Sequence, residues 1–264
     1  RELRPLVGLA HAVGGRTPEA LDPIPATDVP AEVRPLVDAL NDLLARLRAA
    51  LDAQRDFVAD AAHELRTPLA ALQLQAGLIE RSTDADERQA AIGELKAGVA
   101  RAAHTVRQLL TLARNEPGAH EHAPVPVALG ELLRRGVAAH AVLADSRQID
   151  LGATGLDPAA AVTGDTESLA SLVDNLLANA IAHAPAGGRV DVACGVGDGR
   201  PWLAVSDNGP GIPPDERERV FDRFYRRSGT STGGTGLGLA IVATIARRHG
   251  AEIVLGDTAG GGLT

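Results

Sequence analysis

The chain has 264 residues, of which 45% are hydrophobic and only 2% are aromatic, so its core must be built from aliphatic side chains. The formal net charge of -8 argues against nucleic-acid binding as the main task, because that task needs a basic surface. Cys194 is the single cysteine, which excludes an intramolecular disulfide bond. No apolar run approaches the roughly 18 residues that span a bilayer.

Residues 1–52 predict two short helices with a linker between them. Apolar residues recur at three- and four-residue steps in two stretches, separated by a connector rich in proline and glycine: Leu3, Leu6, Leu9 and Val13, then Val33, Leu36, Leu40, Leu43, Leu47 and Leu51. Such stripes fit an amphipathic helix packed on a neighbouring domain, or parallel helices that pair in a dimer as an all-α coiled coil. The layout RPL, connector, PAEVRPLVDALNDLL resembles the HAMP linker of QseC-like sensor kinases, which carries signals from a membrane helix to an output domain.

The second stripe continues into FVADAAHELRTPLAAL at residues 57–72, which predicts one long helix over 35–80. His63 and Thr67 are four residues apart and therefore share one side of that helix, and Glu64 follows His63 directly. A lone His-Glu pair is ordinarily a solvated surface pair. The whole string HELRTPL, however, resembles the phosphoacceptor box of sensor histidine kinases. The resemblance implies that His63 accepts a phosphoryl group, that Glu64 accepts the ring proton, and that Thr67 serves a phosphatase reaction.

A second helix is predicted to end near Asn115 and to begin at Asp84, which stands at N-cap spacing from Glu87. Residues 53–118 would thus form a helical hairpin, which cannot enclose a core alone. Two hairpins can do so as a four-helix bundle. We therefore expect a homodimer with His63 on the surface of the bundle.

Residues 117–126 are rich in glycine, histidine and proline, and we expect a domain linker there, with His120 and His122 solvated rather than metal-bound. The pattern then becomes mixed α/β over residues 124–264. Helices are predicted at 128–143, 165–184 and 236–249, and strands near 149–153, 160–163, 189–196, 201–207 and 251–256. The sequence Gly197-Asp198-Gly199-Arg200 predicts a hairpin between two of these strands.

Three constellations in this α/β part indicate a nucleotide site. Asn175 and Asn179 leave one face of a helix, and an amide oxygen is a hard ligand for Mg²⁺. Asp207 opens the turn DNGPGIP, where a carboxylate can accept a hydrogen bond from an exocyclic amine. The run GGTGLGL at 233–239 opens an apolar helix, and a glycine-rich backbone at a helix N-terminus can cradle phosphate. Each of the three motifs alone also fits an interpretation without any function: an exposed amide pair, an ordinary turn, or a flexible loop.

Together and in this order, the three resemble the N, G1 and G2 boxes of the Bergerat ATP-binding fold, a two-layer α/β sandwich, and residues 219–226 resemble the F box of histidine kinases. The resemblance implies ATP and Mg²⁺ as cofactors, with Asn179 on the metal and Asn175 on the triphosphate side. It implies that Asp207 reads adenine and that Arg226 approaches phosphate. It also implies that glycines shape the base pocket and the hinge of an ATP lid over about 228–234: Gly209 and Gly211 for the pocket, and Gly234, Gly236 and Gly238 for the hinge.

The resemblance covers nearly the whole chain and implies ATP-dependent autophosphorylation of His63, then transfer to an aspartate in the receiver domain of a response regulator. It also implies a membrane connection through an N-terminal segment that precedes Arg1, and thus the cytoplasmic portion of an inner-membrane protein. Two departures stand out. Ala182 replaces the usual Lys or Arg, and the last strand of the family looks truncated at Thr264.

Two other functions remain open from the sequence. One is a Bergerat-fold ATPase that couples hydrolysis to conformational change, against which HELRTPL and residues 219–226 weigh. The other is a catalytically dead scaffold whose second domain binds nucleotide weakly, which Ala182 keeps open.

Overall fold

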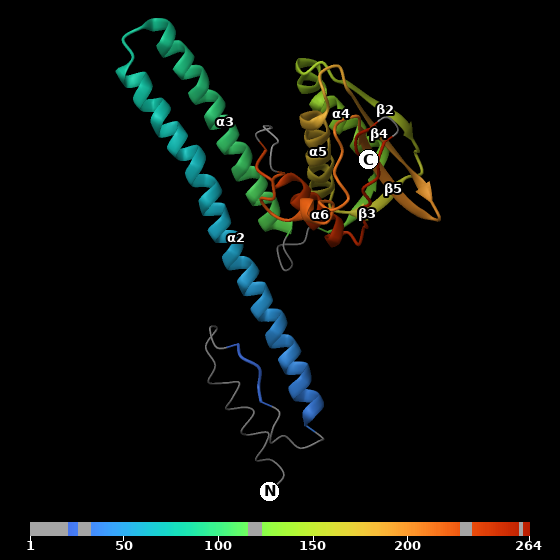
Figure 1. Cartoon of the computed structure of the whole chain (residues 1–264). Coiled ribbons are helices and arrows are strands. Elements are labelled where there is room, and N and C mark those ends of the chain that lie inside the picture. The colour runs from blue at the N-terminus through green and yellow to red at the C-terminus, as the bar shows by residue number, and fades with distance from the viewer. Residues whose placement is uncertain (1–20, 26–32, 116–122, 228–233, 259–260) are drawn as a thin grey trace. The chain divides into compact units, whose positions relative to one another are not determined.

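The computed structural model describes residues 21–25, 33–115, 123–227, 234–258 and 261–264. These residues fall into two compact units, Arg1–Arg66 and Thr67–Thr264, and the long helix α2 (Arg34–Arg81) runs through both. The sequence predicted this helix over 35–80, and the structure confirms it (Figure 1). It continues past Pro68 without interruption.

In the first unit, residues 21–25 are tied to the start of α2. The Ile24 backbone N–H donates to Oδ1 of Asn41 at 2.7 Å, and Nδ2 of Asn41 donates back to the Ile24 carbonyl at 3.1 Å. Ile24 and Val37 are both buried. The connector is therefore held on the second apolar stripe by a reciprocal amide contact; the first predicted stripe, Leu3 to Val13, lies outside the described residues.

In the second unit, the end of α2 and α3 (Ala85–Asn115) form a helical hairpin. Asp84 caps α3 as the sequence predicted, because its Oδ1 accepts from the backbone N–H groups of Asp86 at 2.7 Å and Glu87 at 3.1 Å. Gly98 allows close packing, since a Cβ there would lie 2.8 Å from Leu72. Other apolar positions of the hairpin are exposed, with Leu69 at 54% and Leu74 at 73%.

The α/β part consists of two small sheets and three main helices. Its elements in chain order are β1 (Val125–Ala128), α4 (Leu129–Ser146), β2 (Asp150–Leu156), β3 (Ala161–Gly164), α5 (Thr166–His183), β4 (Arg189–Gly197), β5 (Arg200–Asp207), the 3-10 turn η1 (Arg219–Phe221) and α6 (Gly238–Arg248). Strand β1 pairs antiparallel with β3, while β4 lies between β2 and β5, parallel to the first and antiparallel to the second.

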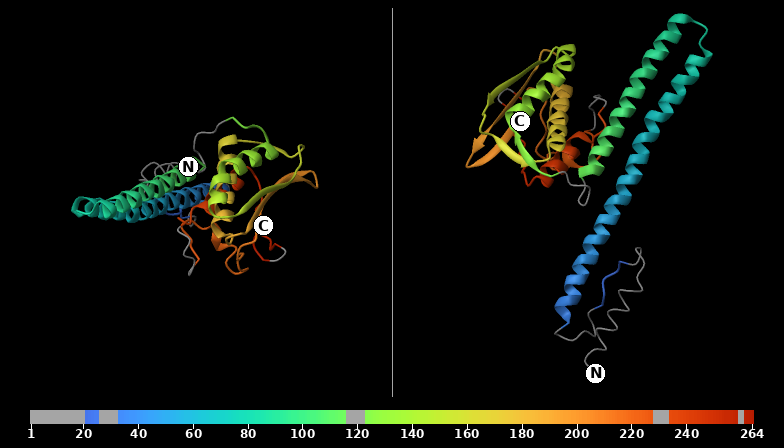
Figure 2. Two further views of the ribbon diagram at one scale, coloured as in Figure 1. Left: turned by 90° about the horizontal axis from the view of Figure 1, so that it is seen from above. Right: turned by 180° about the vertical axis from the view of Figure 1, so that it is seen from behind.

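Helices α4 and α5 cover one face of the β2–β4–β5 sheet, and α6 packs beside α5, which gives the two layers that the sequence predicted (Figures 1 and 2). The interface is aliphatic, as the composition required, with fully buried side chains from both layers: Leu133, Val173, Leu177, Ile181, Val190, Val192, Ile241 and Ile245. Burying each such side chain contributes about 1.5–3 kcal/mol.

The predicted β4–β5 hairpin is confirmed, and its turn places Asp198 at φ 49° and Gly199 at φ 74°, both in the left-handed region. On this hairpin Trp202 lies across Gly195, where a Cβ would come within 2.8 Å of the indole ring. Trp202 is 45% exposed.

Two strand predictions differ from the structure. The segment 251–256 is not a strand, because among the described residues its only ladder-like partner is Thr264, which exchanges two 2.8 Å backbone hydrogen bonds with Gly256. Strand β1 was not predicted, because Val125 and Pro126 lie at the end of the expected linker and Ala128 at the expected start of a helix. None of the helices in the described ranges has the length and hydropathy to cross a membrane.

Candidate functional site

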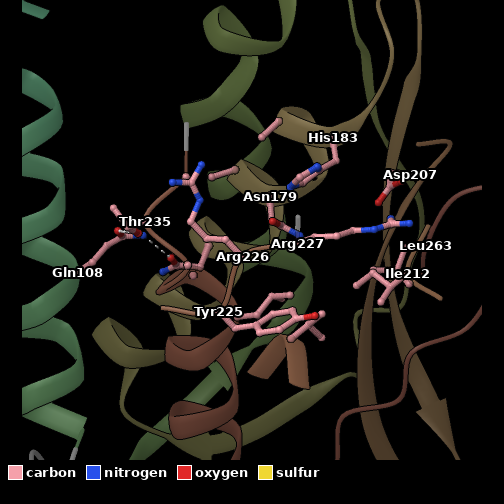
Figure 3. Close-up of a pocket in the computed structure, with 18 of the residues that line it drawn as sticks. Gln108, Asn179, His183, Asp207, Ile212, Tyr225, Arg226, Arg227, Thr235 and Leu263 are labelled. Atoms are coloured by element: carbon pink, nitrogen blue, oxygen red, sulfur yellow. Dashed lines mark hydrogen bonds between the residues drawn. The ribbon is translucent and has the colours of Figure 1, made fainter. Parts of the chain in front are cut away.

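A cavity of about 640 Å³ lies among the second half of α5, the loop after β5, the start of α6 and one side of α3 (Figure 3). The three constellations singled out in the sequence all contribute to its lining, with Asn175 and Asn179 from α5, Asp207 and Gly211 from the loop after β5, and Gly236 from the glycine-rich run. Segments that are far apart in the chain therefore meet at one site.

Helix α5 presents one polar face to this cavity. Asn175, Asn179, Ala182 and His183 recur at three- and four-residue steps and all line it, while Val173 and Leu177 on the other side are buried in the core. Asp165 caps the helix by accepting from the Glu167 backbone N–H at 3.0 Å. The amphipathic pattern thus fixes which side chains face the cavity.

The side-chain amides of Asn175 and Asn179 differ in their hydrogen bonding. Nδ2 of Asn175 donates to the Ser171 carbonyl at 2.7 Å, and its Oδ1 accepts from Nε2 of Gln108 at 3.3 Å. No hydrogen bond from any described residue engages the side-chain amide of Asn179. The Asn179 oxygen is therefore available to a ligand in the cavity.

The turn after β5 is shaped by close backbone approach. Oδ1 of Asp207 accepts from the Gly209 backbone N–H at 2.8 Å. A Cβ on Gly209 would lie 2.7 Å from the carbonyl oxygen of His183, so this position cannot take a side chain without a shift. Gly211 has φ 66°. Asp207 is held at the edge of the cavity near His183, whose pKa is lowered by burial, an effect that the Asp207 carboxylate opposes.

The glycine-rich run enters α6 through a tight contact. Gly236 has φ 72°, and its carbonyl accepts from the Phe224 backbone N–H at 3.0 Å. Gly238 begins α6 and lines the cavity, so the first turn of that helix faces the same space. Gly234 also lines the cavity but has open space around it. The predicted lid residues 228–233 lie outside the described residues.

Two cations come from the segment before the lid. Arg226 and Arg227 both line the cavity, and Nη1 of Arg227 donates to the Gly211 carbonyl at 3.4 Å. Nε of Arg227 also lies 3.5 Å from Oε2 of Glu216. Figure 3 shows Arg226 on the side of the cavity nearer Thr235, and Arg227 extending toward Asp207. Ala182, where the resemblance implied a Lys or Arg, contributes only a methyl group to this lining.

A divalent cation in this cavity would have few protein ligands. In the described part of the chain no group of three or more His, Cys, Asp or Glu residues could hold a metal. Mg²⁺ suits such a site, because it binds through one or two protein oxygens and keeps the rest of its shell as water and phosphate. The unengaged amide oxygen of Asn179 fits that requirement.

The candidate phosphoacceptor residues lie on α2. His63 and Thr67 are exposed and Glu64 is half-buried. His63 and Glu64 belong to the first unit, whereas Thr67 and the cavity belong to the second.

The cavity is also lined by residues that the sequence did not reveal, among them Gln108 on α3, and His183 and Arg147 beside the adenine side of the predicted site. Nη1 of Arg147 donates to the Ile181 carbonyl at 3.2 Å. His183 could have been found, since it follows Asn179 by one helical turn. Gln108 could not, because its partner Asn175 is 67 residues away.

Comparison with known proteins decides the family. Three family models match successive parts of the chain: "Sensor protein PhoQ-like, HAMP domain" over 3–49, "His Kinase A (phospho-acceptor) domain" over 53–118, and "Histidine kinase-, DNA gyrase B-, and HSP90-like ATPase" over 164–264. The chain belongs to the sensor histidine kinases.

The similarity to other histidine kinases extends along the whole chain. Sensor protein QseC of Salmonella typhi is 42% identical over 264 residues, which are 100% of this chain and 58% of that protein. The chain thus spans little more than half the length of this relative. The full-length histidine kinase ShkA in complex with AMPPNP aligns with a TM-score of 0.58 and 27% identity, over 79% of this chain and 44% of that one. The histidine kinase ThkA in complex with response regulator protein TrrA shares the fold, with a TM-score of 0.65 at 19% identity over 82% and 61% of the two chains.

Proposed function

We propose that the whole protein is an ATP-dependent protein-histidine kinase of a two-component system that autophosphorylates His63. The observation that carries the proposal is the combination of an exposed His63 beside Glu64 on α2 with a cavity lined by Asn179, Asp207 and the glycine-rich run. These features support the proposal, because they supply a candidate acceptor on a helix surface and a candidate nucleotide site in the α/β part.

In the cavity, the carboxylate of Asp207 accepts a hydrogen bond from the adenine amine, and Gly209 and Gly211 leave room for the base. The phosphates lie toward the first turn of α6, where the helix N-terminus favours an anion. Gly234, Gly236 and Gly238 allow the lid to move, Arg226 neutralises phosphate charge, and Asn175 supports the triphosphate side. Asn179 would hold Mg²⁺, which would neutralise charge on the transferred phosphoryl group.

The chemical step is an in-line phosphoryl transfer. A ring nitrogen of neutral His63 forms a bond to the γ-phosphorus of ATP while the bond to the β–γ bridging oxygen breaks, and ADP leaves with that oxygen. Glu64 accepts the proton from the other ring nitrogen, which raises the nucleophilicity of the attacking one. The remainder of the catalysis is positioning.

The phosphoryl group then passes from His63 to an aspartate in the receiver domain of a response regulator. In a separate phosphatase reaction, Thr67, one helical turn from His63, orients a water that attacks the phosphorus of the regulator's acyl phosphate, which releases inorganic phosphate and the free aspartate carboxylate. The exposed apolar face of the α2–α3 hairpin supports a homodimer, in which two hairpins close a four-helix bundle. The HAMP match supports a cytoplasmic position next to an inner membrane.

The test is incubation with Mg²⁺ and γ-labelled ATP, wild type beside His63→Gln. Acid-labile, alkali-stable label that disappears in the variant is the expected result. Hydrolysis of ATP without label would favour an ATPase instead. Absence of both label and nucleotide binding would favour a scaffold and refute the proposal.

A further inference from the structure

One face of α3 forms a continuous contact with the α/β part. The residues of this face, here called the docking stripe, are each at most 9% exposed and follow one another at three- and four-residue steps: Thr105, Gln108, Leu112 and Asn115. Three of the four are polar. Such a face differs from an aliphatic core, because its hydrogen bonds can be exchanged for bonds to water when it separates.

Gln108 joins two residues of the proposed nucleotide site. Its Nε2 donates to Oδ1 of Asn175 at 3.3 Å, and its Oε1 accepts from Oγ1 of Thr235 at 2.7 Å (Figure 3). Asn175 lies on α5, and Thr235 lies in the glycine-rich run between Gly234 and Gly236. A single amide with both ends satisfied therefore ties α3 to both sides of the cavity.

A second polar contact lies seven residues further along the docking stripe and outside the cavity lining. Oγ of Ser168 donates to Oδ1 of Asn115 at 2.9 Å, and Nη1 of Arg248 donates to the same oxygen at 3.2 Å. Ser168 is in the first turn of α5 and Arg248 ends α6. The stripe thus holds the α/β part at two points, of which only Gln108 touches the proposed nucleotide site.

We propose that the docking stripe is a latch that opposes binding of Mg²⁺–ATP, with Gln108 as its sensor. This rests on the proposed function. The Asn175 nitrogen donates to the Ser171 carbonyl and its oxygen accepts from Gln108, so docking opposes the rotation of this amide that would aim its N–H groups at the triphosphate. Thr235 must likewise turn from Gln108 when the glycine-rich run closes on phosphate. By linkage, nucleotide weakens docking by the same factor by which docking weakens nucleotide binding.

The coupling is tested by titrating a non-hydrolysable ATP analogue with Mg²⁺ into the wild-type chain and three variants by calorimetry. Gln108→Leu removes both hydrogen bonds of the sensor at similar volume, and we expect it to tighten binding about tenfold, within the range usual for coupled sites. Asn115→Ala breaks the contact outside the cavity and should also tighten binding. Gln89→Leu is the matched control, because Gln89 is exposed on the same helix and lies outside both the docking stripe and the cavity lining, and it should bind as the wild type does.

Hydrogen exchange of the same proteins supplies a second readout. In the wild type the nucleotide should speed exchange of the side of α5 and α6 that Asn115 contacts, and Gln108→Leu should show that faster exchange without nucleotide. Equal affinities in wild type, Gln108→Leu and Asn115→Ala would overturn the latch while leaving the kinase proposal intact. A tenfold gain in nucleotide affinity in Gln108→Leu alone, with the affinity of Asn115→Ala equal to that of the wild type, would also overturn the latch. The effect of Gln108→Leu would then come from the cavity itself and not from docking. Failure of every protein to bind nucleotide would overturn the proposed function and the latch with it.

Discussion

Replacing Gly236 by alanine should destabilise the α/β part by about 2–6 kcal/mol. Two costs add. Gly236 has φ 72°, and holding a non-glycine residue in that region costs about 1–3 kcal/mol. A Cβ at Gly236 would also lie 2.7 Å from the carbonyl carbon of Phe224 and 2.8 Å from the Tyr225 carbonyl oxygen. Because both neighbours are backbone, they cannot rotate away, and overpacking of this kind costs about 1–3 kcal/mol.

Differential scanning calorimetry measures the effect. A change of 1 kcal/mol shifts the unfolding midpoint of a unit of this size by roughly 2–4 °C, so Gly236→Ala should lower it by roughly 4–24 °C. Gly234→Ala is the matched control, because Gly234 has open space around its Cβ position and its φ lies outside the left-handed range. If the two variants unfold at the same temperature, the glycine-rich run does not hold the conformation described, and the reasoning is wrong.

Three further predictions concern function and pH. Thr67→Ala should spare autophosphorylation of His63 and lose phosphatase action on the phosphorylated regulator; a variant that keeps both activities would exclude Thr67 from that role. Ala182→Lys places a cation in the cavity and should tighten Mg²⁺–ATP binding about tenfold in calorimetry, since a hydrogen bond to a charged group is worth about 1.5–3 kcal/mol; Ala186→Lys, in the exposed turn after α5, is the control and should bind unchanged. Burial lowers the pKa of His183 in the folded protein, against the attraction of Asp207 and with Arg147 and Arg227 nearby. The unfolded chain therefore binds the proton more readily, and stability falls as pH drops through the ordinary histidine value toward the lowered one. His183→Gln should reduce the loss of urea resistance between about pH 7.5 and pH 5.5, and an unchanged slope would count against this origin.

Much of the fold could be predicted from local patterns in the sequence. The long helix α2, the Asp84 cap and the β4–β5 hairpin were all predictable, because each depends on residues within a few positions of one another. The polar face of α5 was predictable for the same reason. Helix periodicity alone places Asn175 and Asn179 on one side.

The sequence did not predict features that depend on a partner far away in the chain. Strand β1 is defined by pairing with β3, in which Val125 lies opposite Gly164, and four residues carry too little pattern to indicate that pairing. The expected strand at 251–256 has strand-like composition but meets only Thr264 among the described residues. The contact of Gln108 with Asn175 is of the same kind, because nothing near Gln108 in the chain distinguishes it from a solvated glutamine.

The position of Trp202 has a practical consequence for spectroscopy. The chain contains one tryptophan and one tyrosine, so its indole emission comes from one place, the β4–β5 hairpin, where the ring covers Gly195. Because Trp202 is only partly exposed in the native sheet, its emission should shift to longer wavelength when that sheet opens. Circular dichroism, by contrast, is dominated by the 48 residues of α2 and the 31 of α3. Fluorescence therefore reports the α/β part alone, whereas circular dichroism reports all the helices and gives α2 and α3 the greatest weight. A gap between the two melting curves would show that α2 and α3 unfold separately from the α/β part.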